Sequence, residues 1–120
     1  MIFRVELPIV PSLNNAYAGS AASRRRFAVE RHRNWKTEAG WLVKMANPPK
    51  IDGPYKFLIL VPSGMAGDVS NRIKLAEDLL VDLGVTPDDH LAIEAAARRD
   101  HSVPNGRCVV VVESVSEDVT

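Results

Sequence analysis

The chain has a single cysteine, no long apolar run and no net charge, and each of these features bears on which classes of protein it can belong to. Cys108 is the only cysteine among 120 residues, so an intramolecular disulfide and a cysteine-based zinc site are both excluded. No apolar run approaches the roughly 20 residues of a membrane-spanning helix, and the first residues lack the basic region and apolar core of a signal peptide. We therefore expect a single domain over residues 1–120, cytoplasmic and without membrane association.

A net charge of zero does not by itself suggest a nucleic-acid partner, but the charges are unevenly distributed. Residues 24–44 contain seven basic side chains against two acidic ones, a net charge of +5, whereas residues 65–94 contain seven acidic side chains against two basic ones, a net charge of −5. A metal-dependent nuclease needs a basic segment for its polyanion and an acidic one for its cation. Two solvated surfaces of opposite sign are the simpler explanation of the same counts.

Apolar periodicity predicts four strands and two helices in one α+β domain. Strands are predicted at residues 3–7, 55–61, 90–97 and 107–115. Apolar residues three and four apart predict helices at residues 29–46 and 70–83. Asp68 or Ser70 can cap the second helix and Gly84 can end it. The order of the elements predicts a two-layer architecture, with two helices packed on one mixed sheet.

The second predicted helix places a lysine among acidic residues. Asp68 precedes the helix, Lys74 and Asp78 share a face of it at four-residue spacing, and Asp88 and Asp89 follow it. These last two carboxylates can return to Lys74 only if the strand after them runs alongside the strand at 55–61. Converging carboxylates would suit Mg²⁺ held against a phosphodiester, with Lys74 offsetting charge or orienting water. Helix capping, an i,i+4 ion pair and a turn explain the same residues.

Several linked motifs, in this order, resemble the RusA family of Holliday-junction resolvases, and the resemblance extends over most of the chain. The N-terminal segment 7–15 has the family's strand followed by Pro-Ser and Asn, and a basic stretch and a tryptophan-containing helix come next. The most specific similarity is the segment 68–74, Asp-Val-Ser-Asn-Arg-Ile-Lys, with Asp-Leu-Leu at 78–80 and the later Asp88-Asp89.

This resemblance implies a small dimeric endonuclease that needs Mg²⁺, for which Mn²⁺ can substitute. It implies that Asp68 and Asp89 are catalytic carboxylates that bind the metal and that Lys74 is the catalytic lysine. Asp88 is a lower-ranked metal ligand. Three asparagines are expected to organise or border the site: Asn71, Asn14 and Asn15.

One residue departs from the family pattern, which is typically Asp-x-Asp-Asn. Ser70 stands where the second aspartate is expected, and a hydroxyl is a neutral and weaker Mg²⁺ ligand than a carboxylate. Asp68 and Asp89 with water would then hold the metal, with Ser70 as a weak or water-mediated ligand. The alternative is a catalytically weakened or inactive relative that binds branched DNA.

The basic residues are the expected contacts to DNA. Gly19 to Ser23 predict a loop that leads into Arg24, Arg25 and Arg26, well placed to reach a phosphate backbone. The expected interface continues with Arg31, Arg33, Lys36 and Arg72. A homodimer would place two active sites on opposing strands of a four-way junction. A third interpretation is an interaction protein whose acidic residues only cap helices and face solvent.

Overall fold

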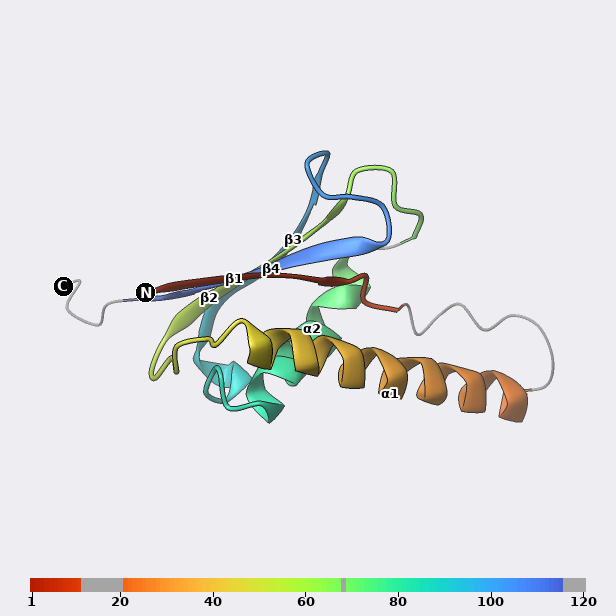
Figure 1. Cartoon of the computed structure of the whole chain (residues 1–120), viewed down its shortest axis with the longest axis horizontal. Coiled ribbons are helices and arrows are strands. Elements are labelled where there is room, and N and C mark those ends of the chain that lie inside the picture. Colours follow the sequence, from red (N-terminus) through yellow and green to blue (C-terminus); the bar gives the residue numbers. More distant parts are fainter. Residues whose placement is uncertain (12–20, 68, 116–120) are drawn as a thin grey trace.

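Four strands form one mixed sheet, and two helices lie on the same face of it (Figure 1). This computed structural model describes residues 1–11, 21–67 and 69–115, without the side chains of residues 21–29 and 71. The predicted two-layer α+β architecture is confirmed. The elements are β1 (Ile2–Pro8), α1 (Ala21–Met45), β2 (Tyr55–Pro62), the 3₁₀ turn η1 (Ser70–Arg72), α2 (Ile73–Asp82), the 3₁₀ turn η2 (Asp89–Leu91), β3 (Ala92–Asp100) and β4 (Arg107–Ser114).

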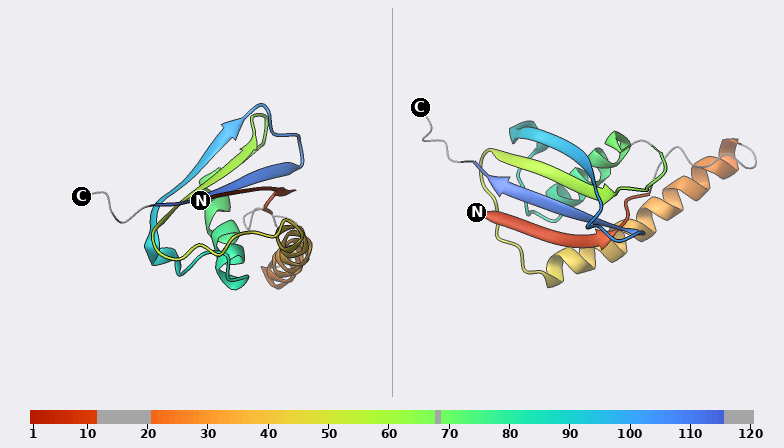
Figure 2. Two further views of the ribbon diagram at one scale, coloured as in Figure 1. Left: turned by 60° about the vertical axis from the view of Figure 1, so that its left-hand side comes forward. Right: turned by 90° about the horizontal axis from the view of Figure 1, so that it is seen from above.

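The strand order in the sheet is β1-β4-β2-β3, which Figure 2 shows from above. β4 pairs antiparallel with both β1 and β2, whereas β2 and β3 are parallel. A parallel pair needs a crossover connection, and the chain between β2 and β3 makes it through α2. Because Tyr55 pairs with Ala92, the residues just before β3 lie beside the start of β2.

The core lies between the helices and the covered face of the sheet. Trp35, Ala39 and Val43 project from α1 at four-residue spacing and are buried against it. The Trp35 Nε1–H donates a hydrogen bond to the Pro8 carbonyl at 2.8 Å, which fastens α1 to the end of β1. From α2, the buried apolar residues are Leu75, Ala76, Leu79 and Leu80. Ile73 and Leu83, on the same side of the helix, are half-buried and pack against this core.

The structure corrects the prediction for the start of α1. The helix already contains Ala21 to Ser23, so the loop predicted up to Ser23 is wrong for these residues. Alanine and arginine are good helix formers, and no proline or glycine interrupts residues 21–28. Arg24, Arg25 and Arg26 therefore belong to a helix rather than to a loop.

The starts of the second helix and of β3 also differ from the prediction. The second helix begins with the 3₁₀ turn η1, and α2 has Arg72 as its N-cap without a side-chain cap, so Ser70 does not cap it. Gly84 ends it as predicted, with a φ of 76°. The strand predicted at 90–97 begins at Ala92 and continues to Asp100, because the Asp88 carboxylate accepts a hydrogen bond from the His90 amide and forms η2 first.

No helix in the described part of the chain has the length and apolar character needed to cross a membrane. Cys108 is fully buried in β4, and burial raises the pKa of its thiol to about 11.

Candidate active site

The parallel pairing of β2 with β3 brings Asp89 to Lys74. The Lys74 Nζ lies 2.6 Å from Asp89 Oδ2 and 3.3 Å from Asp78 Oδ1, one helical turn further along α2. β3 runs alongside β2, which is the arrangement that the sequence analysis required for Asp89 to return to Lys74. Two carboxylates and one ammonium group, separated by up to fifteen positions in sequence, therefore form one cluster, named here the lysine–carboxylate cluster (Lys74, Asp78 and Asp89).

This cluster is open to solvent. The side chains of Lys74, Asp78 and Asp89 are 66%, 43% and 39% exposed. Ion pairs this exposed contribute little to stability, because water and salt screen them. A large polyanion such as DNA can reach all three groups.

The two carboxylates keep Lys74 charged. Hydrogen bonding with Asp89, and then with Asp78, raises the pKa of Lys74 above its usual value. A lysine held in the ammonium form cannot act as a general base. It can donate hydrogen bonds and place positive charge beside an anionic substrate.

A buried carboxylate lies behind the cluster and was missed in the sequence. Glu77 is 8% exposed, and burial, followed by the charge of Asp89, raises the pKa of this carboxyl. Its neighbour Tyr55 has a buried hydroxyl with no hydrogen-bond partner in the described structure, and burial and the charge of Glu77 raise the pKa of Tyr55 to about 12. The available signal was an acidic residue between Ala76 and Leu79, on the apolar side of the helix.

Arg99 positions the segment that leads into the site, and this role was also missed in the sequence. From the end of β3, its guanidinium donates to the carbonyl oxygens of Ser63, Met65 and Gly67, the last at 3.1 Å. These carbonyls belong to the loop after β2, immediately before Asp68. The sequence alone does not indicate which loop the side chain of Arg99 contacts.

The predicted metal ligands are only partly within the described structure. Asp68, Asn14 and Asn15 lie outside the described residues, and the Asn71 side chain is not described either. Asp88 uses one oxygen, Oδ1, to accept from the His90 amide and lies 3.3 Å from His90 Nδ1. Ser70 is exposed in η1.

Among the described side chains, no three His, Cys, Asp or Glu residues lie together in a way that could hold a metal ion. The groups that are present still have the right chemistry for Mg²⁺, which prefers oxygen ligands and usually takes only one or two carboxylates from a protein. The position of the Lys74 ammonium between Asp78 and Asp89 also indicates that a cation is favoured at this place.

The basic residues predicted to meet DNA occupy different environments. Arg31 and Arg33 are exposed on α1, and Arg24, Arg25 and Arg26 precede them on the same helix. Lys36 forms an ion pair with Asp82 of α2 at 2.8 Å.

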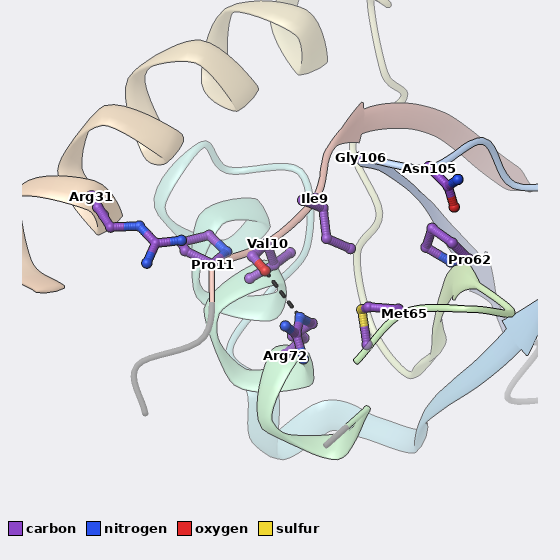
Figure 3. Close-up of a pocket in the computed structure, with 9 residues that line it drawn as sticks. All are labelled: Ile9, Val10, Pro11, Arg31, Pro62, Met65, Arg72, Asn105 and Gly106. Carbon is purple, nitrogen blue, oxygen red and sulfur yellow. Dashed lines mark hydrogen bonds between the residues drawn. The ribbon is translucent and has the colours of Figure 1, made fainter. Parts of the chain in front are cut away.

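Arg72 differs from the other predicted DNA contacts because it is buried, with 6% exposure, and its Nε donates to the Val10 carbonyl at 3.1 Å (Figure 3). Arg72 therefore joins η1 to the end of β1 and does not lie at the surface, where a contact to DNA would place it.

Taken together, the lysine–carboxylate cluster is a solvent-accessible site with one ammonium group and two exposed carboxylates, and the buried carboxylate of Glu77 lies behind it. Such a site can bind a phosphate group through the ammonium and a hard cation through the carboxylates. No family model and no curated protein matches the chain.

Proposed function

We propose that the chain is a Mg²⁺-dependent, structure-selective endonuclease that resolves four-way DNA junctions, like the RusA family that its motifs resemble. The observation that supports this most is the contact between Lys74 Nζ and Asp89 Oδ2, at 2.6 Å. The resemblance assigns catalytic roles to these two residues from their sequence motifs alone. Their meeting at an exposed cluster is what a shared role in catalysis requires.

In this proposal each residue of the site has a defined task. Asp68 and Asp89 would hold Mg²⁺, or Mn²⁺ in its place, with Asp88 and Ser70 as weaker or water-mediated ligands. When bound, the metal supplies positive charge against the charge that develops on the phosphate. Lys74 stays protonated and donates a hydrogen bond to a phosphate oxygen, while Asp78 holds its ammonium in position. Asn71, Asn14 and Asn15 organise the border of the site.

A second candidate function is a catalytically weakened relative that binds branched DNA. One observation favours it: Ser70 is exposed in η1, at the place where the resemblance expects a carboxylate. Loss of one negative charge weakens the affinity for Mg²⁺ while leaving the basic residues of α1 available to DNA.

The partner in either case is branched DNA bound by a homodimer, and the place of action is the cytoplasm. Arg24, Arg25, Arg26, Arg31 and Arg33 are the proposed contacts to the phosphate backbone, together with Lys36 of the same helix. Arg72 is left out of this set because it is buried.

The experiment that tests the proposal compares wild-type protein with Ser70→Asp on a labelled four-way junction and on plain duplex, with Mg²⁺ and with EDTA. Paired, Mg²⁺-dependent nicks confined to the junction would support a working resolvase. A large gain of cleavage in Ser70→Asp over a nearly inactive wild type would support the weakened relative instead. Equal affinity for junction and duplex, with no nicks from either protein, would contradict both functions.

A further inference from the structure

A pocket of about 200 Å³ lies where the ends of β1 and β2 meet the turn before β4 (Figure 3). It is smaller than the roughly 300–1,000 Å³ of sites that take drug-sized ligands, so it suits a single ring system. Its walls combine an apolar part with a polar part, and each part fits a different portion of a nucleotide.

The apolar part of the pocket consists of Ile9, Pro62 and Met65. In Figure 3 these three side chains gather at its centre, from the end of β1, the end of β2 and the loop after β2. Flat aliphatic surfaces and a polarizable thioether are suitable partners for the faces of a nucleobase. This part of the pocket would accept the faces of any base and would not select one.

The polar part is formed by Asn105 and by two arginines. A side-chain amide both donates and accepts hydrogen bonds, as the edge of a base does. Arg72 lines the pocket as a buried cation, and Arg31 approaches from α1 on the side of Pro11 (Figure 3). Two guanidinium groups give this pocket a positive potential that favours a phosphate.

Asn105 is held on an anchored turn. The Arg107 amide donates to the Pro104 carbonyl at 3.1 Å, and Gly106 has a φ of 80°, a conformation that favours glycine. The Ile9 amide in turn donates to the Gly106 carbonyl at 2.9 Å, which joins the turn to the end of β1. An amide fixed in this way is suited to selecting one base over another, because little conformational freedom of the turn remains to be lost on binding.

The pocket and the lysine–carboxylate cluster are linked by one short segment. Met65 and Arg72 line the pocket, Asp68 lies between them in sequence, and Lys74 follows two residues later. We infer that the pocket takes one unstacked nucleotide of the DNA next to the bond that is cut, with its base against Ile9, Pro62 and Met65, its edge at Asn105 and its phosphate at Arg31. This inference rests on the proposed function. It assigns a base preference to cleavage, because a junction offers unpaired bases at its crossover more cheaply than duplex does.

The first test uses the intact protein and does not depend on cleavage. We expect NMR titration with the four 2′-deoxynucleoside 5′-monophosphates to shift the Asn105 side-chain amide and the Gly106 backbone amide for at least one nucleotide. Asn105→Ala should weaken the binding of that nucleotide at least about fivefold, which is the lower end of what one base contact contributes to affinity. Lys50→Ala, an exposed change away from the pocket, should leave the affinity unchanged. Equal shifts with inorganic phosphate alone, or none with any nucleotide, would overturn the inference.

The second test uses junctions that differ only in the bases at the crossover. We expect wild-type protein to cut some of them faster and Asn105→Ala to reduce this preference. Asn105→Asp, which keeps the size of the side chain, should change which base is preferred. An unchanged preference in both variants would overturn the inference while leaving the nuclease proposal intact. If wild type cuts no junction, the nuclease proposal fails, and the nucleotide titration alone decides on the pocket.

Discussion

The charge state of Lys74 is the residue-level property with the clearest consequence for mechanism. Its ammonium group is shared by Asp89 and Asp78, and the hydrogen bonds to these carboxylates raise its pKa. A raised pKa means that the cation persists to higher pH than in a free lysine. In the proposed nuclease, Lys74 would therefore act through its charge and its hydrogen bonds, and another group would remove the proton from water.

A pH profile tests this assignment. We predict that the rate of junction cleavage shows no decline from lysine deprotonation up to pH 9, because the two carboxylates raise the pKa of Lys74 above its ordinary value of 10.5. Lys74→Met should lower the rate by about 10²–10³ at every pH, the usual cost of losing one stabilising donor. A rate that falls with a midpoint between pH 7 and 9, in wild type but not in Lys74→Met, would show that the lysine loses its proton in the working range.

Glu77 gives a prediction about stability. Its raised pKa means that the folded protein takes up a proton more readily than the unfolded chain, so the cost of burying this carboxyl is greatest above the folded pKa and disappears as pH falls toward 4.5. We expect Glu77→Gln to raise the melting temperature at pH 8 and to raise it less at pH 5. Glu38→Gln, on the exposed face of α1, should change it at neither pH. A lower melting temperature for Glu77→Gln at pH 8 would contradict this account.

At the scale of elements, α1 is the unit that presents the predicted DNA contacts. Because α1 contains residues 21–45, three consecutive arginines at positions 24–26 lie within a single turn of it. Consecutive residues on a helix are separated by about 100°, so the three positions face different directions around the helix axis.

Changing Arg24, Arg25 and Arg26 together to Ala should weaken junction binding and reduce its dependence on salt. The slope of log K against log salt should become shallower by about 0.9 for each DNA phosphate that the variant no longer neutralises. Lys44, Lys50 and Lys56 changed together to Ala remove the same charge from exposed positions elsewhere and serve as the control. Fluorescence anisotropy at several salt concentrations measures both effects, and equal slopes for the two triple variants would count against a role for this end of α1.

The sequence predicted which elements exist more reliably than where they begin. Trp35 and Ala39, spaced by four, were enough to predict a helix, but the small and basic residues before Val29 contain no apolar periodicity and were assigned to a loop. A turn at Asp88-Asp89 was predicted, but residues 90 and 91 were assigned to the following strand. The contact from the Asp88 carboxylate to the His90 amide extends the turn into η2 and competes locally with extension of β3.

The candidate site shows a similar limit. That Lys74 and Asp78 share a face follows from helical spacing alone, whereas the return of Asp89 depends on a parallel pairing of two strands that the sequence leaves open. The burial of Arg72 and Glu77 could not be predicted either. Each lies beside residues distant in the chain, Val10 for Arg72 and Tyr55 for Glu77, and charged residues are otherwise expected at the surface.

At the scale of the whole molecule, the proposed function requires two copies of the chain. Symmetrical cutting of a four-way junction needs two active sites related by a two-fold axis. We predict that sedimentation equilibrium gives a mass near twice the 13.2 kDa of one chain, alone or on addition of junction DNA. A protein that stays monomeric in both conditions would contradict the symmetrical mechanism.

The most direct test of the central claim is junction cleavage by Asp89→Asn beside Asp82→Asn. Both variants remove a carboxylate that pairs with a lysine, at 2.6 Å to Lys74 and at 2.8 Å to Lys36, but only the first changes the lysine–carboxylate cluster. We predict that Asp89→Asn, like Asp68→Asn, abolishes Mg²⁺-dependent nicking and leaves junction affinity intact or higher, because a negative charge near the phosphates is removed. Asp82→Asn should cut like wild type. Undiminished cleavage by Asp89→Asn, or loss of binding in parallel with cleavage, would contradict the claim that this cluster is a nuclease site.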